Sequence, residues 1–211
     1  MLVRHFMTAD PFTLSPEQTC GAALSAFRVR RIRRAPVVDG RMLVGIVSER
    51  DLLHILPGTC AQASTQAGEA SVALEVRHVM RTELVTVGPN DHLAQAASLM
   101  LKNRIGGVPV VHEDRLKGII TESDVFKALY AILTPSSGVT IVFEELAQTA
   151  AAGIDYPGLC LKHRLRIHTL LRYPKPAGGA MYYLTVEGEN VDAFVQGLWA
   201  RSNPVVAVEK R

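Results

Sequence analysis

The sequence predicts an α/β protein in which two strand–helix–strand–strand–helix units are followed by a separate βαββαβ domain. Two observations lead to this prediction: a repeat with a constant offset of 73 residues, and a change of pattern after Thr134-Pro135-Ser136-Ser137-Gly138. A length of 211 residues with 48% hydrophobic residues is sufficient for more than one core. We expect a first repeat, a flexible linker, a second repeat and a C-terminal domain at residues 1–57, 58–75, 76–134 and 138–211.

The repeat aligns without gaps over 50 residues. Residues 7–56 match residues 80–129 with 16 identities, which is far above the level of unrelated sequences. The longest matches are Pro36-Val37-Val38 with Pro109-Val110-Val111, and Gly45-Ile46 with Gly118-Ile119. The two copies are therefore expected to form the same elements and to pack as a pseudo-twofold pair.

Each copy predicts a helix, two short strands and a second helix. Ser15-Pro16-Glu17-Gln18 is typical of a helix start, with Ser15 as the cap. Apolar residues at helical spacing follow in both copies: Cys20, Ala23, Leu24 and Phe27, then Leu93, Ala96, Ala97, Met100 and Leu101. The strands are expected at 35–38 and 43–47, and at 108–111 and 116–120. Ser48 and Thr121 are each placed to cap the helix that comes next.

Composition and charge exclude several classes of protein. The net charge of +3 is too small for a dedicated nucleic-acid binder, and the arginine run at 28–34 lacks interleaved aromatic residues. The three cysteines form no CxxC pair, so neither a zinc site nor a disulfide framework is indicated and a reducing cytoplasm is expected. The first residues lack a signal-peptide pattern, and no apolar run is long enough to predict a membrane span.

No catalytic constellation is present. The chain contains no GxSxG, P-loop or GxGxxG motif, and His163 and His168 lack metal-ligand spacing. We therefore expect no enzyme, no catalytic residue and no metal site.

Two features occur in both copies: the Pro-Val-Val strand, and a box that reads Gly45-Ile46-Val47-Ser48-Glu49-Arg50-Asp51 in the first copy and Gly118-Ile119-Ile120-Thr121-Glu122-Ser123-Asp124 in the second. Together they resemble the cystathionine-beta-synthase (CBS) domain pair, or Bateman module. Each box places a hydroxyl and a carboxylate at a helix start. A carboxylate can accept two hydrogen bonds from a ribose diol, and free N–H groups at a helix start favour phosphate. The alternative is that Ser48…Asp51 and Thr121…Asp124 are only capping boxes.

The resemblance implies a regulatory adenosyl ligand (AMP, ADP, ATP or S-adenosylmethionine) and no required cofactor. It places ribose on Asp51 and Asp124 beside Ser48 and Thr121, and the adenine near Thr13 and Thr86 with Ile32 and Ile105 as apolar walls. Phosphate is expected at Arg34, with Arg33 beside it, whereas the second copy has Gly107 at that position. One asymmetric site, or two unequal sites, is therefore expected.

The last seventy residues predict strands at 139–143, 165–173, 180–186 and 205–208. Helices are expected at 144–152, after Asp155, and at 191–200 with Val191, Phe194, Val195, Leu198 and Trp199 on one stripe. In the strand at 165–173, Leu165, Ile167, Thr169 and Leu171 are expected to share one face. This order is ferredoxin-like and resembles an ACT domain, including Asp155-Tyr156-Pro157-Gly158-Leu159. A CBS pair followed by an ACT-like domain resembles the acetoin-utilisation B protein family, which is linked to acetoin or acetate metabolism.

Three functions remain at this point: an adenine-nucleotide sensor that regulates an unknown partner protein, an interaction scaffold without ligand, and an enzyme with an unrecognised site. The first is preferred. A homodimer is also expected, because apolar side chains such as Phe27, Met100 and Leu101 exceed what one small unit can bury.

Overall fold

The computed structural model describes residues 1–55, 71–134, 137–145, 155–176, 178–200 and 204–210. It divides into two compact units, Met1–Ala128 and Leu129–Arg211, each of which is considered by itself. Cys60, most of the expected linker and most of the helix expected at 144–152 lie outside the described residues. Within the described part of the chain, no helix is long and apolar enough to cross a membrane.

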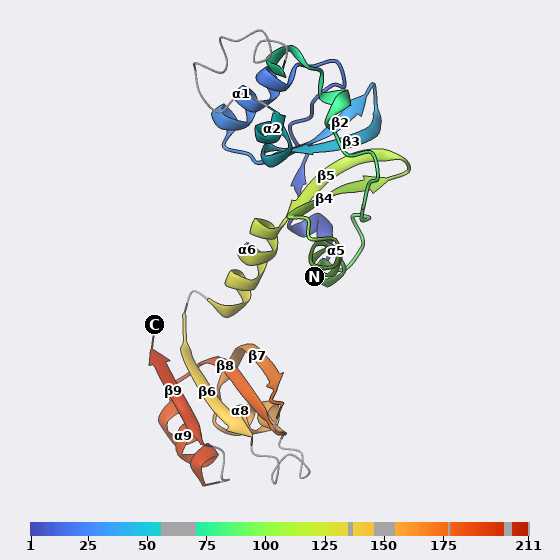
Figure 1. Ribbon diagram of the computed structural model, residues 1–211. Helices are drawn as coiled ribbons and strands as arrows, with labels where there is room; N and C mark the ends of the chain where they lie inside the picture. Colours follow the sequence, from blue (N-terminus) through green and yellow to red (C-terminus); the bar gives the residue numbers. More distant parts are fainter. Residues whose placement is uncertain (56–70, 135–136, 146–154, 177, 201–203, 211) are drawn as a thin grey trace. The chain divides into compact units, whose positions relative to one another are not determined.

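The two repeats in the first unit have the same elements. The first contains α1 (Cys20–Arg30), β2 (Arg34–Asp39), β3 (Met42–Ser48) and α2 (Glu49–Ile55), and the second contains α5 (Leu93–Asn103), β4 (Gly107–His112), β5 (Arg115–Thr121) and α6 (Glu122–Leu133). Each strand pair has the same register and the same bulge, since Pro36 pairs with Ile46 and Pro109 with Ile119. The hairpins meet where Met42 pairs with Arg115 (Figure 1). The expected equivalence of the two copies is confirmed.

The leading segments of the two repeats are exchanged. The segment of η1 (Val3–His5) and β1 (Thr8–Ala9) begins the first repeat, but Val3 is buried in the core of the second and Thr8 pairs with Ile119 of β5. Conversely, η2 (Val76–His78) begins the second repeat, and Val76 is buried in the core of the first. Each repeat therefore completes its core with the leading segment of the other.

Two glycines make room for this exchange. A Cβ atom on Gly45 would lie 2.5 Å from the sulfur of Met80, and one on Gly118 would lie 2.8 Å from the sulfur of Met7. Real Cβ atoms do not come this close to other heavy atoms, so only glycine lets the strand pass under the methionine without a shift. The packing of the exchanged segments thus explains the Gly-Ile match between the copies.

The first helix starts later in the structure than predicted, and the exchanged segment explains why. Helix α1 begins at Cys20 with Thr19 as its cap, and Thr19 Oγ1 accepts a hydrogen bond from the Ala22 N–H. The predicted cap at Ser15 is wrong, because the turn at 15–18 binds the exchanged segment. The carbonyls of Pro16 and Gln18 accept hydrogen bonds from Arg77 and Val76.

Each repeat has its own core. Cys20, Ala23, Leu24 and Phe27 are buried in the first and Leu93, Ala96 and Met100 in the second, as expected, whereas Leu101 is 79% exposed. Phe27 and Met100 thus give no apolar surface for a dimer. The exposed apolar side chains of the repeat helices instead include Val29, Leu53, Leu101 and Phe126.

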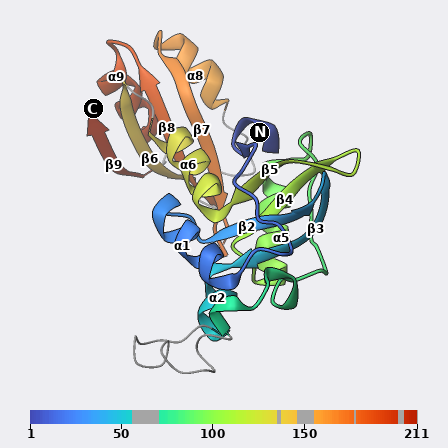
Figure 2. The same cartoon turned by 90° about the horizontal axis from the view of Figure 1, so that it is seen from above.

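The second unit is a four-stranded antiparallel sheet with two described helices. Its elements are β6 (Val139–Glu145), α8 (Tyr156–Lys162), β7 (Arg166–Pro174), β8 (Ala180–Glu187), α9 (Val191–Trp199) and β9 (Val205–Lys210), and the strand order is β7-β8-β6-β9. This order is that of a ferredoxin-like βαββαβ domain. Side chains of α8 and α9 pack with the strands into one core. Figure 2 shows these two helices beside the sheet of the second unit. Asp155 caps α8 by accepting from the Gly158 N–H, as expected.

Three predictions for this unit are corrected. Strand β6 continues through Glu144 and Glu145, which were expected to be helical. In β7 a bulge between Ile167 and Thr169 reverses the alternation, so that Leu170 packs on the core and Leu171 is exposed. The expected face of Thr169 and Leu171 is therefore wrong. Trp199 is also largely exposed rather than part of the buried stripe of α9.

Candidate functional site

In both boxes the carboxylate accepts hydrogen bonds from the residue at the helix start, and the first box is a reciprocal capping box. Asp51 Oδ2 accepts hydrogen bonds from the Ser48 N–H at 2.9 Å and the Ser48 hydroxyl at 2.5 Å, while Ser48 Oγ accepts from the Asp51 N–H. In the second repeat, Asp124 Oδ2 accepts from the N–H and hydroxyl of Thr121 at 3.0 and 2.6 Å. Each carboxylate thus has one oxygen committed to the helix start and one that faces away from it.

The first box opens into a cavity of about 700 Å³ between the two repeats. Its wall includes Ser48, Asp51 and Arg34 from the first repeat together with Ile105 and Gly107 from the second. Five arginines and four carboxylates line it: Arg33, Arg34, Arg50, Arg81, Arg104, Glu49, Asp51, Glu83 and Glu122. Such a cavity has the polar groups to hold a ligand that carries hydroxyls and negative charge.

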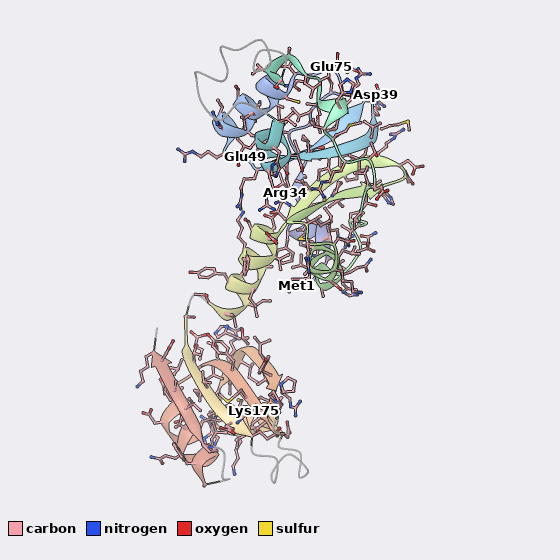
Figure 3. The ribbon with its side chains drawn as sticks, in the orientation of Figure 1. Met1, Arg34, Asp39, Glu49, Glu75 and Lys175 are labelled. Carbon is pink, nitrogen blue, oxygen red and sulfur yellow. The ribbon has the colours of Figure 1, made fainter. Side chains whose placement is uncertain are left out.

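Arg34 extends across the junction of the repeats. A Cβ atom on Gly106 would lie 2.3 Å from one guanidinium nitrogen of Arg34, and a Cβ on Gly107 would lie 3.2 Å from its Cδ. The arginine therefore lies over the two glycines that stand where the first repeat has Arg33 and Arg34. Figure 3 shows Arg34 near Glu49 at this junction. The second copy thus has glycine in place of Arg34, and this glycine leaves space for the Arg34 side chain of the first copy.

The guanidinium of Arg34 is partly desolvated. Burial lowers the pKa of Arg34 below its ordinary value, against the opposing attraction of Glu122. Among the described residues, the guanidinium of Arg34 has no hydrogen-bond partner and no ion pair within 4.0 Å. An arginine with unused donors in a cavity can bind a phosphate with two parallel hydrogen bonds.

The second oxygen of Asp51 is paired with a residue from the other repeat. Arg81 donates to Asp51 Oδ1 at 3.2 Å. Burial alone would raise the pKa of Asp51, but the hydrogen bonds from Ser48 and the pairing with Arg81 outweigh it and hold this pKa below 3.8. The carboxylate therefore stays ionised at neutral pH.

The lowered pKa predicts a pH-dependent stability of the first repeat. Asp51 stabilises the folded state above pH 3.8, and this contribution is lost as the pH falls through its lower folded-state pKa. We expect Asp51→Asn to lower the free energy of unfolding by about 1 kcal/mol at pH 7, because the neutral amide loses the attraction of the carboxylate to the helix N-terminus and to Arg81. The difference should shrink below pH 3.8. Denaturant unfolding at pH 7 and pH 3 measures it, with Glu49→Gln as the control in the same helix turn. An equal loss at both pH values would contradict this prediction.

The cavity brings together about half of the predicted site residues. It contains Arg33, Arg34, Ser48, Asp51, Ile105 and Gly107. Ile32 packs on the core of the first repeat, Thr86 is exposed, and Thr121 and Asp124 form their box without lining the cavity. Thr13 lines a separate hollow with Asp10, Arg41, Arg115 and Lys117. The predicted adenine contacts of Thr13 and Thr86 are therefore not in this cavity.

Sequence reasoning missed the contribution of the segment that leads into the second repeat. Arg81, Glu83, Leu84 and Val85 line the cavity, as do Arg104 and Gly106. The signal for this segment was the repeat of Val3-Arg4-His5 as Val76-Arg77-His78, which extends the alignment upstream of Met7. Within the described residues, no cluster of three or more His, Cys, Asp or Glu side chains could hold a metal ion.

Comparison with known proteins agrees with the repeat pair. The model of the CBS domain matches residues 3–58 and 76–131, which together exceed half of the chain. The chain belongs to the CBS domain family. It is 34% identical over 123 residues to the CBS domain-containing protein YhcV of Bacillus subtilis, covering 58% of this chain and 81% of YhcV. The chain spans 46% and 50% of the length of two longer relatives, from Methanocaldococcus jannaschii and Thermofilum pendens.

Solved structures agree with the fold of the CBS pair. The acetoin utilization protein AcuB from Vibrio cholerae is 35% identical with a TM-score of 0.54, over 63% of this chain and 93% of AcuB. CBSX2 in complex with AMP is 26% identical with a TM-score of 0.54, over 63% of this chain and 98% of that chain. The CBS pair of MJ0100, in complex with 5′-methylthioadenosine and S-adenosyl-L-methionine, is 25% identical with a TM-score of 0.50, over 61% and 95%. Solved relatives of this CBS pair thus hold adenosyl ligands.

Proposed function

We propose that this CBS protein is a regulatory adenine-nucleotide sensor. It binds AMP, ADP, ATP or S-adenosylmethionine between its repeats and modulates a partner protein, without chemistry of its own. One observation carries the proposal: the Ser48–Asp51 box opens into a cavity whose opposite wall comes from the second repeat and whose cations include Arg34. The AMP complex of CBSX2 and the S-adenosylmethionine complex of MJ0100 support the class of ligand.

The two carboxylates have separate roles in this proposal. Asp51 accepts the hydroxyls of a ribose in the cavity, and Ile105 supplies an apolar wall for the base. Asp124 with Thr121 forms a second, weaker ribose site, because the equivalent of Arg34 in that repeat is Gly107. Arg33 and Arg34 bind phosphate. The adenine contacts of Thr13, Thr86 and Ile32 stay proposals for ligand-bound states.

Replacement of Arg34 tests the phosphate role. Arg34→Ala should weaken ATP binding about tenfold and leave adenosine binding nearly unchanged, because only the phosphates lose a charged hydrogen-bond partner. Isothermal titration calorimetry with ATP and adenosine at two salt concentrations measures this. ATP binding to the wild type should weaken as salt rises, and more steeply than ATP binding to Arg34→Ala.

The matched control is Arg28→Ala, in the same arginine run but outside the cavity wall. An equal loss for ATP and adenosine in Arg34→Ala would remove Arg34 from the phosphate site and leave the ribose assignment in place. Equal ATP losses in the two variants would point to a general effect of charge.

The proposal for the C-terminal unit is an ACT-like regulatory domain. Its ferredoxin-like strand order and the Asp155 cap before Tyr156-Pro157-Gly158 support this assignment. With AcuB among the similar structures, we propose a regulatory role in acetoin or acetate metabolism. The buried, unpaired Cys20 and Cys160 fit the cytoplasm, where thiols stay reduced. Burial raises the pKa of Cys160 to about 11, so that its thiol is unreactive.

We further propose a homodimer. Val29, Leu53, Leu101 and Phe126 are large apolar side chains that the repeat helices leave exposed, with exposed fractions from 51% to 84%. A second copy would cover them. Sedimentation should show a dimer at micromolar concentration, and Leu101→Glu should shift it toward monomer while Lys102→Glu does not. A wild-type monomer under these conditions would contradict the proposal.

The second candidate function is a scaffold that uses the same surfaces without a ligand. It is favoured by the ion pair of Arg81 with Asp51, which completes the box without any other molecule. A thermal-shift screen with AMP, ADP, ATP and S-adenosylmethionine separates the two. A higher melting temperature with any of them supports the sensor, and no shift and no heat with all four supports the scaffold.

A further inference from the structure

The carboxylate of Asp51 has little acceptor capacity left. An ionised carboxylate offers about four lone-pair sites, two on each oxygen. Both sites on Oδ2 are used by the N–H and hydroxyl of Ser48, and one site on Oδ1 is used by Arg81. One site remains. A ribose diol brings two hydroxyl donors, so it cannot be held by Asp51 while Arg81 keeps its hydrogen bond.

The competing cation is fixed at its base. The backbone N–H of Arg81 donates to the Ile46 carbonyl at 2.9 Å, and the Ile46 N–H donates to the Arg81 carbonyl at 3.0 Å. Ile46 lies two residues before Ser48 in β3. The side chain of Arg81 is nevertheless 61% exposed, while that of Asp51 is 16% exposed. The guanidinium can therefore swing away into solvent while its backbone stays in place.

The second repeat has a different arrangement. Thr8 occupies the position equivalent to Arg81 and makes no hydrogen bond to Asp124 within the described residues. The outer oxygen of Asp124 instead contacts Lys127 at 3.4 Å, three residues further along the same helix. Only the first box is thus bridged to the opposite repeat by a cation.

We propose that Arg81 is the specificity-determining residue of the first site, held by Asp51 until a nucleoside diol displaces it. This inference rests on the proposed function. A ligand with both ribose hydroxyls takes Oδ1 and releases Arg81, while a 2′-deoxynucleoside needs only the remaining acceptor site. Occupancy by a ribonucleoside thus breaks the Asp51–Arg81 link between the repeats.

The displacement has an unusual salt signature. Adenosine is uncharged, so salt has no direct electrostatic effect on its contacts. Salt does weaken the exposed ion pair that adenosine must break. Adenosine should therefore bind the first site more tightly as salt is raised, opposite to the expectation for ATP.

The test is calorimetry with adenosine and 2′-deoxyadenosine in the Asp124→Ala background, which leaves the first site to be measured alone. Arg81→Met keeps the aliphatic stem, removes the charge, and should bind adenosine about twofold to fivefold more tightly, the range of an exposed ion pair. Its affinity for 2′-deoxyadenosine should not change, and its adenosine binding should lose the salt dependence. The control is Arg77→Met, an arginine that pairs with Glu17 and Glu75 outside the cavity.

Unchanged or weaker adenosine binding in Arg81→Met would overturn the displacement. The carboxyl pKa of Asp51, measured by NMR without ligand, is an independent readout: it should rise in Arg81→Met and not in Arg77→Met, and an unchanged value would also overturn the inference. Absence of adenosine binding in every variant and in the wild type would instead reject the nucleotide function, and the displacement with it.

Discussion

Replacing Asp51 with alanine should weaken adenosyl binding at the first site about tenfold to hundredfold. A ribose diol on an ionised carboxylate makes charge-assisted hydrogen bonds, and the loss of such a partner costs about 1.5–3 kcal/mol. Among the residues that the structure describes, Asp51 is the carboxylate that is bound to Ser48. Calorimetric titration with AMP measures the effect, at a temperature where the variant is folded.

The two repeats provide the controls for this experiment. Asp124→Ala should remove the second, weaker phase of a two-site titration and leave the first. Asp39→Ala, at the exposed end of β2 and away from the cavity, should leave both. Loss of both phases in Asp51→Ala would mean that the sites are not separate, and loss of neither would remove Asp51 from ribose binding.

Introducing an aspartate at Val3 should lower the free energy of unfolding by about 3–5 kcal/mol. Val3 is 0% exposed in the core of the second repeat. The substitution loses about 1.5–3 kcal/mol of apolar burial and adds the cost of a buried carboxyl without a partner. Denaturant unfolding measures the loss, with Val29→Asp on the exposed face of α1 as the matched control.

Hydrogen exchange shows which repeat is affected. Because Val3 packs against the second repeat, Val3→Asp should speed exchange in β4 and β5 more than in β2 and β3. Val76→Asp should do the reverse. Faster exchange mainly in the repeat that follows each mutated residue in sequence would contradict the exchange of segments.

The sequence alone predicted most of the secondary structure because each copy served as a check on the other. In the two repeats, the strand limits were off by one residue at each end, as at Arg34 and Ser48, and the boxes formed where expected. Strands β6 and β9 end two residues later than predicted. The predicted helix start at Ser15 failed because a distant segment binds that turn. The predicted alternation of faces in β7 failed for a related reason, because the pairing of β7 with β8 has a bulge at 167–169.

The cavity was predictable only in part. Ser48, Asp51 and Arg34 could be named because a motif or an arginine run marks them. Arg81 could not be named, because the sequence Met80-Arg81-Thr82-Glu83 does not indicate which repeat this segment packs against. The position of Arg34 over Gly106 is likewise a contact between the copies. An alignment of the two copies shows which residues are equivalent, but it does not predict the contacts between the two repeats.

The exchange of leading segments has a consequence for the ancestry of this chain. A single-copy ancestor could bury its equivalent of Val3 or Val76 in the same way only by pairing with another molecule, each lending its N-terminal arm to the other. Such an ancestor would have been a domain-swapped homodimer. Gene duplication and fusion then joined the two subunits into one polypeptide. In a fused chain the two copies can differ from each other, as Arg34 of the first repeat and Gly107 of the second do.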